Sequence, residues 1–462
     1  MVSEMKNKLL FISIFFIIFL SFNLNIFHTY DNDIIQQQTY TTSPGSFDGE
    51  SQSLVIGSVL EYKLNGFMTG LGRLSRIDYK SSNWYENVYF TYQFYLNIKE
   101  YKGQSFEMYY SQLGGQGVLF RVLEKVFTVL NLDAATKYMY FQQFSSTLYI
   151  LLLSTIIYII MREFGKLAGV FGLASILLSH WVILISQNLY WVVWTWFLPM
   201  IVSMVYVHKY FNKSSKKHFR IYLLILFISV AFRALCGYEF ISSILVSAVI
   251  PYLYALIKTK TNLRKSIGDL LKISITAISA FITVITAHLI YIAFTWKSFK
   301  GAYDFLLFVI LKRTHGNLVD SFSDDYPIFG QSLDVPLLEV LNTQFNTSLL
   351  IYQWDNTTFI LRFYHLFFII LIAFFFIIYL VVKDMKLNRG YKNLAISVGL
   401  IISFLSPITW FVLAKGHTAA HPHLIPILWY LPFLIFGMSS VGYAISMLDL
   451  SRFKIRNLNK SY

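Results

Sequence analysis

The chain has 462 residues, of which 56% are hydrophobic and 18% are aromatic, but only 13% are charged. Soluble domains carry about 25% charged residues, so this composition excludes a soluble enzyme and a disordered chain. The net charge of +14 raises the question of nucleic acid binding, which depends on where the 38 Lys and Arg residues lie. The single cysteine, Cys236, excludes an internal disulfide and a Cys-based metal motif.

Apolar segments approach the length of about 20 residues that a helix needs to cross a bilayer. The sequence therefore predicts an all-α polytopic membrane protein with about ten transmembrane helices. The predicted spans cover residues 8–27, 139–161, 167–186, 188–207, 221–237, 238–257, 272–295, 361–382, 393–413 and 424–446. No small-residue cleavage site follows the first span, so residues 1–27 are interpreted as a retained signal anchor.

The distribution of charge predicts the orientation of these spans, because basic residues near helix ends stay on the cytoplasmic side. With both termini in the cytoplasm, most Lys and Arg fall in short inner segments and in the basic tail 447–462, while most acids fall outside. We expect a multi-pass protein of the cell (plasma) membrane, with helices 2–7 over 139–295 and helices 8–10 over 361–446. The basicity is then a topology signal and does not support nucleic acid binding.

This topology leaves two large outer loops, 28–138 and 296–360, and a short outer turn, 414–424. Long loops inside a compact protein are usually functional, and these two contain apolar stripes typical of interfacial helices. The clearest stripe predicts an amphipathic juxtamembrane helix near 115–131, with Val118 and Val122 on one face and Arg121 and Glu124 on the other.

The segment before this helix, SQLGGQG at 111–117, is rich in glycine. Glycines allow a backbone to approach a ligand or a neighbouring helix closely. Gln112 and Gln116 of this segment are therefore included among the candidate donor-binding residues.

Carboxylates directly outside the first span are candidates for a general base. Asp31 and Asp33 would lie at the membrane surface, where a base can accept a proton from a hydroxyl group on the aqueous side. The alternative is that they only solvate the end of the first helix. The other acids of the first loop that compete for this role are Asp48, Glu50, Glu61 and Asp78.

Arg233 and Glu239 bracket a hairpin at the outer ends of the fifth and sixth spans. Ionisable residues at membrane depth usually face the protein interior and often mark a substrate path. Arg233 would bind a lipid-linked phosphate, or it would form an ion pair with Glu239 that fixes the hairpin. Both interpretations remain open at this point.

The outer turn at 414–424 combines one lysine with three histidines: Lys415, His417, His421 and His423. His417 and His421 have the spacing of a metal-binding helix, but Pro422 interrupts it and no Cys or acid lies nearby to complete a tetrahedral site. The favoured hypothesis is a cluster of donors for a phosphate or for sugar hydroxyls, and no residue is assigned to a metal.

The tryptophans of the spans gather on their outer halves, whereas a membrane anchor would place them at both interfaces. This distribution predicts an outer cavity lined by aromatic rings. The residues concerned are Trp181, Trp191, Trp194, Trp196, Trp296, Trp410 and Trp429.

With its long outer first loop, early acids and juxtamembrane helix, the chain resembles the membrane glycosyltransferases with the C-type fold. Two strings, SQLGGQG at 111–117 and KGHTAAHPHL at 415–424, look like motifs of uncharacterised bacterial members of this superfamily. The resemblance implies a sugar donor on a polyprenyl phosphate, a first-loop acid as base and a divalent metal as a possible cofactor. By position, Asp31 or Asp33 would be that base, with Arg233 and the histidine turn near the donor phosphate.

The first hypothesis is therefore a glycosyltransferase that moves a sugar from a polyprenyl-phosphate donor to a cell-surface glycan, lipid or protein acceptor on the outer face. A second is an O-antigen-type polymerase or ligase, in which Lys312 and Arg313 of the second large loop would serve. A third is a non-enzymatic lipid or solute transporter, although the polar candidates gather outside rather than along the whole membrane depth.

Overall fold

The computed structural model describes residues 2–24, 48–67, 69, 73–78, 84–213, 215–314, 335–354, 357–384, 389–422 and 424–458. The catalytic candidates Asp31 and Asp33, and His423 of the outer turn, lie outside the described residues. The helices are α1 (Val2–Leu24), α3 (Gly49–Asn65), α4 (Trp84–Tyr95), α5 (Gly115–Val129), α6 (Ala134–Phe164), α7 (Lys166–Leu177), α8 (His180–Ile185), α9 (Trp194–Tyr210), α10 (Lys216–Cys236), α11 (Ile241–Lys258), α12 (Leu263–Trp296), α13 (Phe299–Leu311), α16 (Leu337–Phe345), α17 (Phe363–Asp384), α18 (Arg389–Leu413), α19 (Lys415–Ala420) and α20 (Phe433–Leu458), with 3-10 helices η2 (Phe211–Lys213) and η3 (Ile425–Tyr430).

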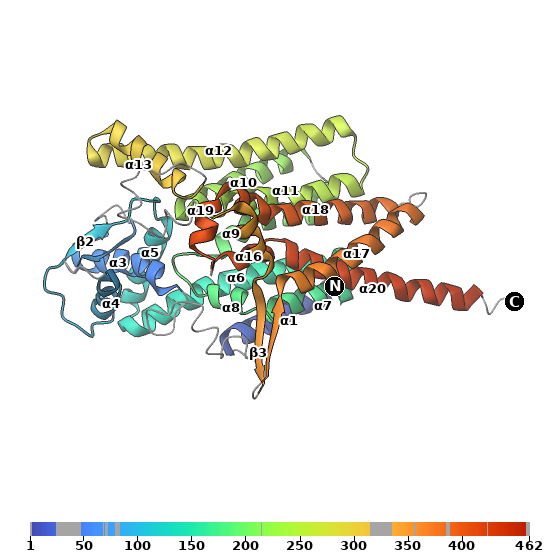
Figure 1. Ribbon diagram of the computed structural model, residues 1–462, viewed down its shortest axis with the longest axis horizontal. Helices are drawn as coiled ribbons and strands as arrows, with labels where there is room; N and C mark the ends of the chain where they lie inside the picture. Colours follow the sequence, from blue (N-terminus) through green and yellow to red (C-terminus); the bar gives the residue numbers. More distant parts are fainter. Residues whose placement is uncertain are drawn as a thin grey trace.

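The long helices form a bundle in which α11 packs on α9 and α18, α20 packs on α7, and α10 packs on α12 (Figure 1). Among the described residues, seven helices are long and apolar enough to cross a membrane. They are Met5–Leu24, Ala134–Phe164, Lys216–Cys236, Ile241–Lys258, Leu263–Trp296, Phe363–Asp384 and Gly390–Leu413. The chain thus has the helices of a multi-pass membrane protein, whereas the count of ten spans stays a prediction.

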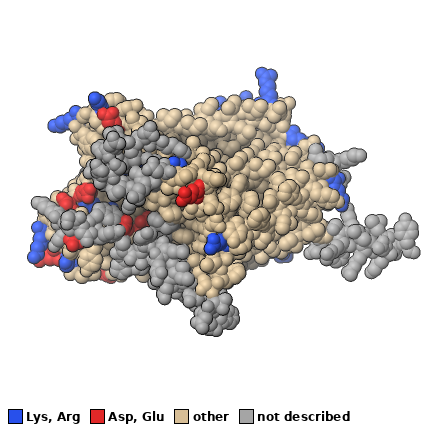
Figure 2. Space-filling model, in the orientation of Figure 1, with Lys and Arg blue, Asp and Glu red and all other residues tan. Residues whose placement is uncertain are grey.

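The two ends of the bundle differ in charge. Helices α3, α4 and α5 and strands β1 and β2 form a lobe at one end of the bundle, and α20 ends at the other (Figure 1). On the face drawn in Figure 2, the end where α17 meets α18 shows Lys and Arg without Asp or Glu, and acidic side chains lie toward the opposite lobe. We call the lobe end the outer end and the basic end the inner end, following the orientation predicted from the sequence.

Three predicted spans are shorter or interrupted, for local reasons. The segment 167–186 breaks after α7 because the side chain of Ser179 caps the new helix α8 by accepting a hydrogen bond from the Val182 N–H. In 188–207, helix α9 begins only at Trp194. The Asn188 side chain accepts hydrogen bonds from the N–H groups of Tyr190 and Trp191 and holds the preceding segment in a turn. In 424–446, η3 precedes α20.

The expectation of a purely helical chain is corrected by two small antiparallel sheets outside the spans. Strand β1 (Ser75–Asp78) pairs with β2 (Ser105–Met108), and β3 (Ser348–Trp354) pairs with β4 (Thr357–Arg362). The sequences of β3 and β4 are rich in β-branched and aromatic residues, which favour strands. Both large loops therefore carry structure of their own.

Helix α5, Gly115–Val129, lies within the segment 115–131, and its charged face is turned toward the protein. Arg121 is buried and forms an ion pair of 3.1 Å with Glu61 of α3, while Glu124 forms one of 2.8 Å with Lys137 of α6. Val118, Val122, Val126 and Val129 are exposed. A row of exposed valines beside the bundle suits a helix that lies in a membrane interface.

This arrangement predicts a large cost for removing Arg121. The Arg121→Met variant leaves Glu61 buried without its cation, which costs about 3–5 kcal/mol of unfolding free energy. Thermal unfolding of the purified protein in detergent measures the loss. Lys125→Met, at an exposed position of the same helix, should stay within about 0.5 kcal/mol of wild type. Equal melting temperatures for the two variants would contradict the ion pair.

Candidate functional site

A cluster of charged side chains lies at the outer end of the bundle, where α10 turns into α11. Glu239 accepts a hydrogen bond from Arg313 at 3.0 Å, and one of its oxygens lies 3.7 Å from the Arg233 guanidinium. The same guanidinium donates to the backbone carbonyl of Glu239 at 3.0 Å. The structure thus brings the predicted pair together in an ion pair and adds Arg313, from the end of α13, as its third member.

The backbone at Gly237 makes this cluster possible. Its φ of 154° belongs to the region that favours glycine, and a Cβ at this position would collide with Gln112 and Glu239. Both side chains are therefore packed against the same turn. Helix α10 ends here because the Gly237 N–H caps the last carbonyls of the helix.

The glycine-rich segment before α5 approaches α10 closely, as its sequence allows. A Cβ at Gly115 would come within 3.1 Å of Leu235. Gln116 is buried and donates a hydrogen bond of 3.1 Å to the carbonyl of Tyr190. Gln112 is 1% exposed, and within the described part of the chain neither its amide nitrogen nor its amide oxygen has a hydrogen-bond partner. A buried amide of this kind, packed at the Gly237 turn that also holds Glu239, is suited to a ligand.

The histidine turn packs against the same cluster. The N–H groups of Gly416 and His417 donate to the carbonyls of Thr314 and Arg313, at 3.3 and 3.1 Å. The ring of His417 is buried against Phe240, and Lys415 at the start of α19 is half-buried.

His421 stacks near His417 with ring centroids 4.9 Å apart. No group of three His, Cys, Asp or Glu side chains suited to a metal exists among the described residues. The described part of the turn therefore places Lys415, His417 and His421 next to the arginine cluster.

Among the described acids of the first loop, Asp48 combines burial with a pKa close to neutral. It caps α3 and is 7% exposed, and the Trp191 indole N–H donates to its carboxylate at 2.6 Å. Burial raises the pKa of Asp48 to about 6, against the pull of its hydrogen bonds from Trp191 and Ser51. Its carboxylate is thus held by neutral donors and titrates close to neutral pH.

A chain of polar groups leads from Asp48 to the arginine cluster. Burial, together with the charge of Asp48, raises the pKa of Glu50 to about 7. Arg76 interacts electrostatically with Glu50 and with Tyr190, which in turn interacts with Glu239 and Arg313. Sequence reasoning named most of the charged members but missed Tyr190 and Arg76.

Tryptophan side chains separate the acid from the arginines. The Trp191 ring, which binds Asp48, lies 6.0 Å from the Trp196 ring, and the Arg233 guanidinium lies 5.6 Å from the centroid of Trp196. The expectation of an outer cavity lined by the tryptophans is corrected, because most of them are packed in the core. Those that are buried are Trp181, Trp191, Trp196, Trp410 and Trp429.

Next to Arg313, Lys312 adds a further cation. Burial lowers the pKa of Lys312 to about 8, and the charge of Arg313 acts in the same direction. The outer end thus combines an acid that titrates near neutrality with a basic cluster that can bind an anion.

No family model and no curated protein matches the chain. Among solved structures, it is similar to the apo form of the oligosaccharyltransferase of Archaeoglobus fulgidus, with a TM-score of 0.45 and 10% sequence identity. The match covers 98% of this chain and 52% of the other, so this chain spans about half the length of that protein. At this level the similarity gives no correspondence between individual residues.

Proposed function

We propose that the chain is a membrane glycosyltransferase that moves a sugar from a polyprenyl-phosphate donor to a glycan, lipid or protein acceptor on the outer face. One observation carries the proposal: a buried carboxyl group with a pKa near neutrality, Asp48, stands at the same end of the bundle as the cluster of Arg233, Glu239 and Arg313. A sugar phosphate needs both a base for the incoming hydroxyl and cations for the leaving phosphate.

In this mechanism, the donor phosphate binds Arg313 and Lys312, and the amide of Gln112 donates to it. Asp48 accepts the proton of the acceptor hydroxyl as its oxygen attacks the anomeric carbon. The bond from that carbon to the phosphate oxygen breaks, and the polyprenyl phosphate leaves with the electron pair. Attack opposite the leaving group inverts the configuration of the sugar.

Asp48 is favoured over Glu50, whose pKa is also raised, because Asp48 is more deeply buried and accepts a hydrogen bond from the Trp191 indole. It is favoured over Glu61 because Asp48 has no ion pair among the described residues. Glu61 is bound to Arg121, whose guanidinium lies 3.1 Å away, and Asp78 accepts a hydrogen bond from Ser105 at an exposed edge. Asp31 and Asp33 remain the alternatives, and they differ from Asp48 in lying directly after the first span.

A transfer assay tests this proposal. Membranes that contain the protein are incubated with lipid-linked sugars labelled in the sugar, and labelled products are separated by size. A single added sugar supports the proposed transferase, whereas a ladder of lengthened chains would indicate a polymerase or ligase. Asn variants at 31, 33 and 48 are compared singly and together, and full activity in all of them would remove these acids as the base.

The raised pKa of Asp48 predicts a pH dependence. A base must be deprotonated, so kcat/KM should fall about tenfold per pH unit below about 6 and be constant above it. The folded protein also holds this proton more tightly than the unfolded chain, so the stability that Asp48 contributes is present at low pH and is lost as the pH rises through about 6.

Rates measured between about pH 5 and pH 8 check this profile. The Glu50→Gln variant should retain the acidic limb, since Glu50 is not the proton acceptor. A flat profile for the wild-type protein over this range would exclude Asp48 as the base.

A further inference from the structure

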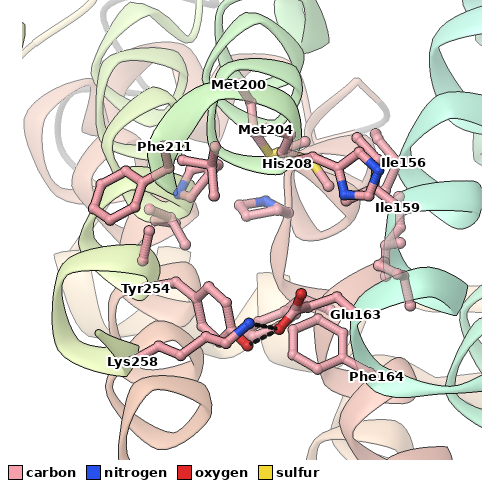
Figure 3. A pocket seen from close by; sticks show the side chains of 18 of the residues that line it. Ile156, Ile159, Glu163, Phe164, Met200, Met204, His208, Phe211, Tyr254 and Lys258 are labelled. Atoms are coloured by element: carbon pink, nitrogen blue, oxygen red, sulfur yellow. Dashed lines mark hydrogen bonds and ion pairs between the residues drawn. The ribbon is translucent and has the colours of Figure 1, made fainter. Parts of the chain in front are cut away.

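A cavity lies far from the outer cluster, between the inner halves of α6, α9 and α11 and the start of α20 (Figure 3). Its volume is about 180 Å³. Cavities of about 150 Å³ lined by apolar side chains hold molecules of the size of benzene. Figure 3 shows Met200, Met204 and His208 on one side of it and Tyr254 and Glu163 on the other.

The lining changes from polar to apolar along the helices. At the inner end are Glu163, His208, Lys258 and Thr259, while Ile156, Met200, Ile250 and Ile435 line the deeper part. The steps from Met200 to His208 and from Ile250 to Lys258 each cover eight residues, or about 12 Å of helix. That length approaches the roughly 15 Å of hydrocarbon in one leaflet of a bilayer.

The polar end carries an excess of positive charge. Lys258 and Tyr254 both donate to the carboxylate of Glu163, and Lys392 donates to its backbone carbonyl at 2.6 Å. His208 interacts electrostatically with Arg162, Lys209 and Lys258 as well as with Glu163. Lys258 and Lys392 thus act on the Glu163 carboxylate, and Arg162 and Lys209 add two further positive charges near His208.

We propose that this cavity binds an anionic phospholipid of the inner leaflet, with part of one acyl chain between α6, α9 and α11 and the phosphate beside His208, Lys209 and Lys258. The charge selects an anionic headgroup, since each Lys or Arg near a headgroup favours an anionic lipid. The apolar depth excludes a free phosphate as the occupant. This site is independent of the transferase at the outer end.

Native mass spectrometry of the purified full chain tests the site. The protein is prepared in detergent with equal amounts of phosphatidylglycerol and phosphatidylcholine, and retained lipids are counted. We expect one phosphatidylglycerol, preferred by at least about tenfold. In the Ile159→Trp variant, the larger side chain fills the cavity from a half-buried position, and the protein should no longer retain phosphatidylglycerol. Lys209→Gln should weaken its retention about fivefold.

The matched control is Lys265→Gln, which removes an exposed inner lysine outside the cavity lining and should retain the lipid like wild type. Equal retention of the two lipids would overturn the proposal, as would unchanged retention in Ile159→Trp. Retention of a polyprenyl phosphate in place of phosphatidylglycerol would also overturn it. If Ile159→Trp fails to fold, Lys209→Gln and Lys265→Gln test the site: equal retention of phosphatidylglycerol by these two variants would overturn the proposal.

Discussion

Replacing Asp48 by Asn is expected to lower the rate of sugar transfer by about 10²–10⁴-fold, the usual contribution of a general base. Asn has nearly the same shape, and its amide oxygen can still accept the hydrogen bond from the Trp191 indole. Asp48 uses its second oxygen to accept from the Ser51 N–H at 3.5 Å, and Asn has no second acceptor, so the variant loses this weak cap of α3 when it keeps the bond to Trp191. The variant therefore removes the proton acceptor at the cost of one weak hydrogen bond at the start of α3.

The loss should appear in kcat, because Asp48 is not among the residues proposed to bind the donor phosphate, Arg313, Lys312 and Gln112. The matched control is Asp304→Asn on α13, which removes an exposed acid of the outer end and should transfer sugar at the wild-type rate. Melting temperatures of both variants verify that they are folded. If the Asp48→Asn variant transfers sugar at more than half of the wild-type rate, another group accepts the proton.

Replacing Glu239 by Gln is expected to destabilise the protein by about 3–5 kcal/mol. The buried carboxylate serves two guanidinium groups, since Arg233 and Arg313 both lie against it. Gln keeps the shape but not the charge, so Arg233, which is 1% exposed, loses its counter-charge. Thermal unfolding in detergent measures the loss.

The exposed acid Glu339 of α16 provides the control, and Glu339→Gln should melt like wild type. A double variant, Arg233→Gln with Glu239→Gln, should recover part of the lost stability, because residues in one ion-pair cluster do not act additively. Additive losses would mean that the two side chains are not coupled, against the geometry of the turn.

The sequence predicted the features that depend on local patterns. Apolar segments located most helices, and the helical spacing of Val118, Val122 and Val126 located α5. The ion pair of Arg233 and Glu239 was one of two interpretations of the segment 233–239, since its two charges are close along the chain. These signals need no knowledge of which segments meet in space.

The remaining features depend on contacts between distant segments. The helical spacing in α5 predicted an apolar face and a charged face, but it did not show which face is buried. Arg121 and Glu124 are buried because they pair with Glu61 and Lys137, which come from other helices. The environment of Asp48 likewise comes from Trp191, 143 residues away. That contact and burial distinguish Asp48 from Glu50, and the ion pair of Glu61 with Arg121 distinguishes Glu61 from Asp48.

The interrupted span 188–207 shows that a break in a helix is also hard to predict from the sequence. The run from 188 to 207 is apolar enough for a span, but hydrogen bonds from the Tyr190 and Trp191 N–H groups to the Asn188 side chain hold its start in a turn. This turn places the Trp191 indole on Asp48 and the Tyr190 carbonyl on Gln116. The deviation from regular helix therefore builds part of the candidate site.

The most direct test of the proposed transferase compares cells with and without the gene, by analysis of their surface glycans and of their polyprenyl-phosphate-linked sugars. The expected result is loss of one sugar from a surface glycan and accumulation of the corresponding lipid-linked donor, both reversed by the wild-type gene but not by the Asp48→Asn gene. Unchanged glycans and unchanged lipid-linked sugars in the cells without the gene would contradict the proposed function.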